Sequence, residues 1–111
     1  MESLHNYLTA QIDRCQTHCA KLRSDNRADE AVFEKIRGNV FDIFRSVLTA
    51  AEKQSEPESF FRERLEQIPA QWEHALTLAK EHGDDEKAHI ESIKLSAVRE
   101  IRAFLSLEVK P

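Results

Sequence analysis

Two cysteines and a histidine lie within one short stretch of the chain and could ligate a metal ion. His18 and Cys19 follow Cys15 by three and four residues, which places them on one face of a helix. A structural zinc ion needs four ligands, and the chain has no second cluster of cysteine and histidine to complete the set. Both cysteines also fall on the apolar stripe of their segment, where a reduced cysteine behaves as a small hydrophobic side chain. Packing is therefore favoured for Cys15 and Cys19, with metal binding as the alternative.

A disulfide between these two cysteines is not expected. Residues four apart in a helix have Cβ atoms about 5 to 6 Å apart, whereas a disulfide requires roughly 3.5 to 4.5 Å. Reduced thiols agree with a cytoplasmic location.

Two Glu-x-x-His motifs, Glu2 to His5 and Glu86 to His89, have the spacing found in di-iron helical bundles. Each motif opens a predicted helix. If the first and last helices are antiparallel, the motifs lie at opposite ends of the bundle, about 30 Å apart. The apolar stripes of the middle helices also carry no glutamate to complete such a site. No di-iron site and no cofactor are therefore expected.

Nucleophilic catalysis requires a nucleophile, a nearby base and usually an oxyanion hole built from loop or glycine amides. The chain has only two glycines, its predicted loops are short, and no glycine-rich phosphate-binding loop is present. The acid pairs Glu30 with Glu34 and Glu63 with Glu66 could hold Mg²⁺, but pairs beside basic residues are typical of solvated helix faces. The sequence therefore favours a protein that is not an enzyme.

Apolar residues recur at steps of three and four along nearly the whole chain, which is the period of an amphipathic helix. No segment shows the two-residue alternation of a strand, and two glycines and three prolines are too few for the tight turns of an all-β fold. An all-α fold is predicted. The four apolar stripes are Leu8, Ile12, Cys15, Cys19 and Leu22; Phe33, Ile36, Val40, Ile43 and Val47; Phe61, Leu65, Ile68, Trp72, Leu76 and Ala79; and Ile90, Ile93, Ala97, Ile101 and Phe104.

Capping signals place the ends of these helices. The polar run 24–26 can cap a second helix, the run 55–58 has the Ser-x-x-Glu spacing of a capping box, and Gly83 followed by Asp84 can end one helix and begin the next. Helices are predicted near residues 3–23, 27–53, 57–82 and 84–108. Short connections between long helices predict an antiparallel up-down bundle of four segments, forming one domain over residues 1–111.

Pro69 falls inside the third predicted helix. A proline in a helix interior removes one hydrogen bond and costs about 3 kcal/mol. The third helix is therefore expected either to kink at Pro69 or to break into two pieces, 57–67 and 69–82.

The last predicted helix carries apolar residues outside its core stripe. These are Leu95, Val98, Leu105 and Val109, and Arg102 interrupts them. Because monomeric proteins seldom expose large apolar patches, this second stripe predicts an interface, either for a second copy in a homo-oligomer such as a dimer or for a helical protein partner. The alternative is that the bundle covers the last helix more fully than four simple stripes imply.

Composition and charge narrow the class of partner. The net charge of −4 opposes binding to nucleic acid, and no apolar run reaches the length of a membrane span. The N-terminal residues lack the positive charge and apolar core of a secretory signal, which predicts a cytoplasmic protein. The favoured function is a protein-protein interaction, regulatory or scaffold role through self-association. The alternatives are a chaperone-like binder of a partner helix and a metal-binding helical bundle.

Overall fold

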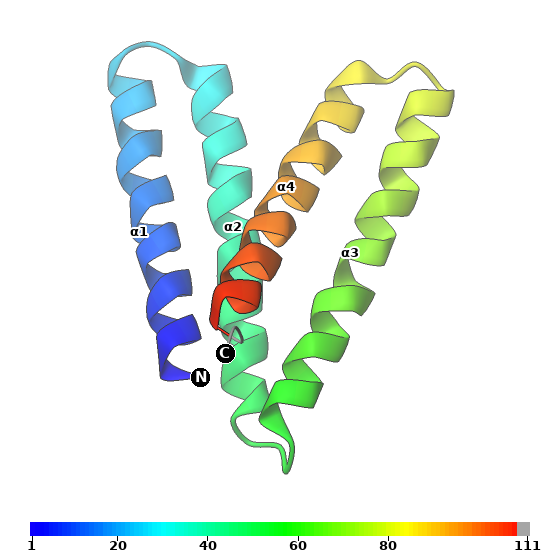
Figure 1. Cartoon of the computed structure of the whole chain (residues 1–111). Coiled ribbons are helices and arrows are strands. Elements are labelled where there is room, and N and C mark those ends of the chain that lie inside the picture. Colours follow the sequence, from blue (N-terminus) through cyan, green and yellow to red (C-terminus); the bar gives the residue numbers. More distant parts are fainter. Residues whose placement is uncertain (109–111) are drawn as a thin grey trace.

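The computed structural model describes residues 1–108, which form four long α-helices and no strand. Their bounds are α1 Glu2–Ser24, α2 Ala28–Ala51, α3 Pro57–Glu81 and α4 Asp85–Glu108. Consecutive helices run in opposite directions (Figure 1). The predicted all-α bundle of four segments is confirmed, with each boundary close to its predicted position.

The helices form two hairpins that diverge toward the α1–α2 and α3–α4 loops (Figure 1). Helix α2 contacts all three other helices, and α4 contacts both α2 and α3. Helix α1 packs mainly on α2, and it reaches α4 through the rings of Tyr7 and Phe104, which stack with centroids 4.2 Å apart. The two helices that begin at the divergent end, α2 and α4, are therefore the ones most enclosed by neighbours.

The loops that close the two hairpins share one hydrogen-bonding pattern. The amide of Arg27 donates to the carbonyl of Leu22, and the amide of Asp84 donates to the carbonyl of Ala79, each over 2.8 Å. Asn26 and Gly83 both adopt positive φ, as the Schellman motif requires of the residue that ends a helix. Gly83 therefore ends α3 as predicted.

The predicted N-terminal caps have mixed outcomes. The Asp84 carboxylate accepts from the amide of Lys87 over 3.1 Å, so this residue caps α4 as predicted. The capping box expected from Ser55 to Glu58 does not form, because the residue before α3 is Glu56 and it makes no side-chain cap. The run 24–26 likewise ends α1 and does not cap α2, whose first helical residue follows Arg27.

Helix α3 continues without interruption through Pro69, which is buried. The alternative of two separate pieces, 57–67 and 69–82, is therefore wrong. Residues on both sides of the proline, among them Leu65 and Ala79, are buried. Because this burial holds both halves of the helix against the bundle, it offsets the hydrogen bond that the proline cannot make.

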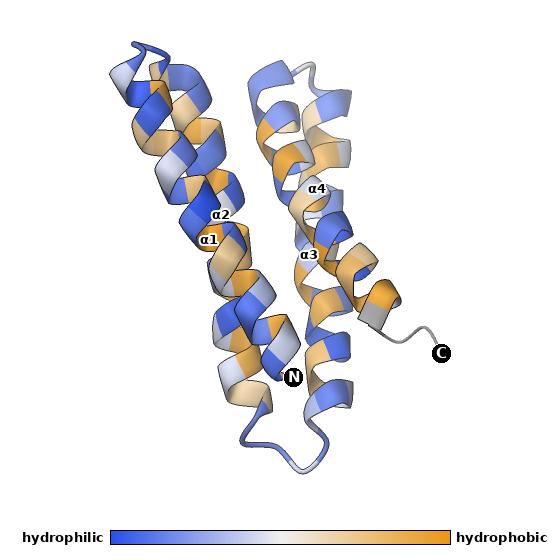
Figure 2. Cartoon of the chain, turned by 60° about the vertical axis from the view of Figure 1, so that its left-hand side comes forward, coloured by the Kyte–Doolittle hydropathy of each residue, from blue (hydrophilic) through white to orange (hydrophobic). Residues whose placement is uncertain are grey.

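The hydrophobic core confirms the stripe of the first helix and corrects that of the second. The five predicted residues of α1 are all buried. In α2 the buried face is centred on Phe44 and Phe41, whereas the predicted core residue Ile43 is 39% exposed. Helix α2 has α1 on one side and α3 and α4 on another. The part of its wide apolar arc that faces these neighbours is the part around Phe41 and Phe44, and not the part that carries Ile43. Figure 2 shows apolar residues gathered on helix faces that meet a neighbour and hydrophilic residues in the loops.

Candidate functional site

The predicted interface on the last helix is mostly covered by the fold itself. Leu95 is 9% exposed and Val98 is fully buried, while Leu105 packs partly buried against the core. The Arg102 guanidinium donates to the carbonyl of Leu65 in α3 over 3.2 Å. Val109 lies outside the described residues.

The expectation of an exposed stripe on α4 is therefore wrong for Leu95 and Val98. Helix α4 has one apolar face toward α2 and a second toward α3, so both of its stripes are used within one chain. The alternative, in which the bundle covers the last helix more fully, describes the structure.

An exposed apolar stripe is found instead on α2. Val32 is 51% exposed and Ile43 is 39% exposed, and Ile36 and Val47 are half-buried. At 100° per residue these four side chains lie within about 60° of one another around the helix, and they extend over about 22 Å of its length. We call Val32, Ile36, Ile43 and Val47 the α2 stripe.

Polar residues border the α2 stripe on the side away from the core. Lys35, Asn39 and Asp42 are exposed there, and Asp42 pairs with Arg45 over 3.1 Å. Together with residues of α1, they line a groove of about 330 Å³ between α1 and α2. At its floor the two helices approach so closely that a Cβ built on Gly38 would lie 2.9 Å from the Cβ of Cys15. Small residues at the floor and long residues at the rim explain the concave shape.

A polar network joins α1, α2 and α4 next to this close approach. The Arg37 guanidinium donates to both carboxylate oxygens of Glu100, at 2.7 and 2.9 Å, and it also donates to the Cys15 sulfur at 3.2 Å. Glu34 pairs with Arg37 over 3.3 Å and with His18 over 3.3 Å. Bidentate pairing of this kind fixes the geometry between two elements, so the network orients α4 on α2.

The Cys15, His18 and Cys19 cluster is held by packing and by local partners. Both cysteines are reduced and buried, and the Cys19 thiol donates to the carbonyl of Ala31 over 3.4 Å. His18 turns to Glu34. Over residues 1–108, no three histidine, cysteine or acidic side chains converge in a way that could hold a metal ion.

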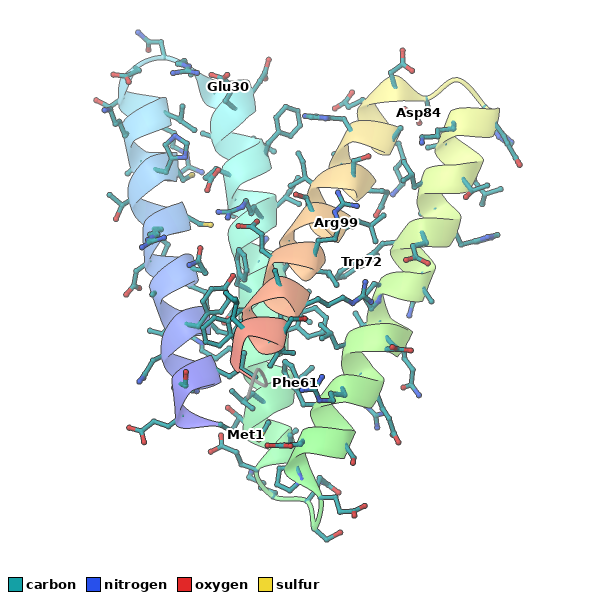
Figure 3. The ribbon with its side chains drawn as sticks, viewed as in Figure 1. Met1, Glu30, Phe61, Trp72, Asp84 and Arg99 are labelled. Carbon is teal, nitrogen blue, oxygen red and sulfur yellow. The ribbon has the colours of Figure 1, made fainter. Side chains whose placement is uncertain are left out.

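The two Glu-x-x-His motifs also stay apart, because α1 begins at one end of the molecule and α4 at the other (Figure 1). His89 packs its ring edge-on against Phe33 of α2, with centroids 4.5 Å apart. Trp72 projects from α3 toward α4, where the Lys94 ammonium lies 5.6 Å from the ring centroid (Figure 3). His89 thus packs α4 against α2, and Trp72 packs α3 against α4.

Burial raises the pKa of the Cys15 thiol to about 11, and the neighbouring Glu34 carboxylate adds to the rise while Arg37 opposes it. Unfolding returns the pKa to its ordinary value near 9. The resulting stabilisation is complete below about pH 9 and is lost as the pH rises toward 11. At 1.36 kcal/mol for each pH unit, the loss reaches about 3 kcal/mol.

Urea unfolding of wild type and of Cys15→Ala between pH 8 and 11 measures this loss. The free energy of unfolding of the wild type is expected to fall more steeply with pH, because the Cys15 thiol is the one titratable group by which the two proteins differ. Parallel curves for the two proteins would contradict the assignment to Cys15.

Comparison with known proteins finds no matching family model, no matching curated protein and no matching solved structure. None of the helices in the described part of the chain is both long enough and apolar enough to cross a membrane.

Proposed function

We propose that this chain is a non-enzymatic protein-protein interaction module that binds its partner through the α2 stripe. The observation that carries the proposal is the exposure of Val32 and Ile43, at 51% and 39%, on one face of a helix whose inward face, centred on Phe44 and Phe41, is buried. Apolar anchors spaced along a single helix face are a recurring way of packing against a partner helix. The half-buried Ile36 and Val47 extend the same face and enlarge the area that a partner would cover.

A binding role agrees with the environment of the most nucleophilic residue type in the chain. The Cys15 thiol is buried and its pKa is raised to about 11, so very little reactive thiolate is present at neutral pH. The Arg37 guanidinium that contacts this sulfur is also engaged with Glu100. These groups therefore have a structural role, because they stabilise the contact between α1, α2 and α4. The exposed surface of α2 is then the part that we propose for recognition.

The test compares two doubly substituted proteins with the wild type. Val32→Glu with Ile43→Glu places two charges on the α2 stripe. Leu78→Glu with Leu107→Glu is the matched control, because these leucines are exposed by 42% and 68% on other helices and gain the same charge. Circular dichroism and thermal unfolding establish that both proteins stay folded.

Association is measured in two ways, by sedimentation of the purified protein up to high micromolar concentration and by recovery of stoichiometric partners from extract of the source cells. We expect the stripe variant to lose an association that wild type and control both keep. If the stripe variant keeps every association of the wild type, or if the wild type has none, the proposal is wrong.

A further inference from the structure

The α2 stripe is symmetric along the helix. Its four residues are separated by steps of four, seven and four, so the order of spacing is the same when the helix is read in either direction. The chemical types are symmetric too, with valines at the two ends and isoleucines inside. The centre of the pattern lies between residues 39 and 40.

Two antiparallel copies of one helix related by a two-fold axis require this kind of pattern, because each contact between residue i and residue j must occur twice. When two copies of α2 pack antiparallel about an axis at the centre of the stripe, Val32 of each copy faces Val47 of the other, and Ile36 faces Ile43. A parallel pair also has a two-fold axis, but that axis runs along the helices and each residue faces its own copy. The antiparallel arrangement matches large with large and small with small at every level.

The charges beside the stripe favour the same arrangement. Lys35 and Asp42 are both exposed on the side of the stripe that borders the α1–α2 groove. A two-fold axis perpendicular to antiparallel helices keeps that side of one copy next to the same side of the other. Lys35 of one copy then lies within about one half-turn of Asp42 of the second copy, and the reciprocal pair repeats the contact.

We propose that the partner of the α2 stripe is a second copy of this chain, packed antiparallel through α2 about a two-fold axis near residues 39 and 40. This inference rests on the proposed function, because it names the occupant of the same surface. Four side chains from each copy make a small interface, so the dimer is weak and depends on concentration.

Cross-linking of engineered thiols tests the register. Val32→Cys and Val47→Cys proteins are mixed and treated with a short bismaleimide, and the products are identified by mass spectrometry. In the antiparallel register the two engineered positions face each other, whereas two copies of position 32 are about 22 Å apart along the helix. The mixed product is therefore expected to exceed either self-linked product, and the wild type with its buried cysteines shows the background.

Charge reversal tests the pairs at the edge of the interface. Lys35→Glu alone and Asp42→Lys alone each place like charges together twice in the dimer and are expected to weaken self-association about tenfold. The double variant, Lys35→Glu with Asp42→Lys, restores opposite charges and is expected to recover most of the loss. Restoration distinguishes a contact between copies from a general effect of charge.

Three results would overturn the inference. A self-linked Val32→Cys product in excess of the mixed product indicates parallel packing, which leaves the proposed function intact. A stoichiometric partner of different sequence, lost from the Val32→Glu with Ile43→Glu protein while the wild type stays monomeric, also refutes self-pairing and keeps the proposed function. Absence of any association that depends on the stripe refutes both.

Discussion

Phe44→Ala is expected to lower the free energy of unfolding by about 3 to 5 kcal/mol, the range for truncating a fully buried phenylalanine. Phe44 has no exposed surface, and its ring meets that of Phe61 edge-on with centroids 6.1 Å apart. Such aromatic pairs add about 0.5 to 1.5 kcal/mol beyond the area they bury. Because Phe44 lies in α2 and Phe61 in α3, the substitution weakens the contact that joins the two hairpins.

The neighbouring residue provides the control for this prediction. Ile43→Ala removes an apolar side chain from the next position of the same helix, but this side chain is 39% exposed and is expected to contribute about 1 kcal/mol or less. Urea unfolding followed by circular dichroism measures both variants. Equal losses, or a larger loss for Ile43→Ala, would show that the inward face of α2 is the one predicted from the sequence and would contradict the structure.

The helices could be predicted from the sequence because their signals are local. The three-and-four spacing of apolar residues identifies each helix without reference to its neighbours, and Gly83 ends α3 where its positive φ is needed. At Pro69 the sequence left both a kink and a break open, and the structure shows one continuous helix. The cost of a proline is local, whereas the burial that offsets it comes from residues in other helices.

The inward face of each helix depends on where the other helices lie, and this information is not local. Helix α2 has an apolar arc wide enough to permit several orientations, and only its contacts with α1, α3 and α4 select the face centred on Phe44. The sequence also does not show which helices lie beside α4. For that reason its second apolar stripe resembled an interface. The bundle buries Leu95 and Val98, whereas Val32 and Ile43 of α2 are exposed.

One buried charge also escaped prediction, because Glu91 sits among acids and lysines that give the local sequence a solvated character. It is 1% exposed, and its Oε1 atom accepts from the Lys94 ammonium at 3.3 Å and lies 3.2 Å from that of Lys87. Its Oε2 atom is buried and has no hydrogen-bond partner in the described part of the chain. A buried polar atom without a partner costs about 1 to 3 kcal/mol.

Glu91→Met is therefore expected to raise the free energy of unfolding by about 1 to 3 kcal/mol. Methionine keeps the length of the side chain and removes the buried carboxylate, and replacing buried ion pairs by apolar residues of similar volume is often stabilising. Solvent screens both ion pairs, because the Lys87 side chain is 52% exposed and that of Lys94 is 26% exposed, so the substitution gives up little compensating attraction.

Substituting the two lysines, with Glu91 kept, distinguishes the effect of the carboxylate from the effect of its partners. Lys87→Met with Lys94→Met leaves the Glu91 carboxylate buried without a counter-charge and is expected to destabilise the protein by about 3 kcal/mol. Adding Glu91→Met to that variant is expected to restore most of the lost stability. Glu73→Met, at an exposed position of α3, controls for the general effect of the substitution and should change stability by less than about 0.5 kcal/mol. A clear loss of stability in Glu91→Met alone would mean that the two lysines stabilise the carboxylate by more than its burial costs, and that this charge helps to hold α4 in place.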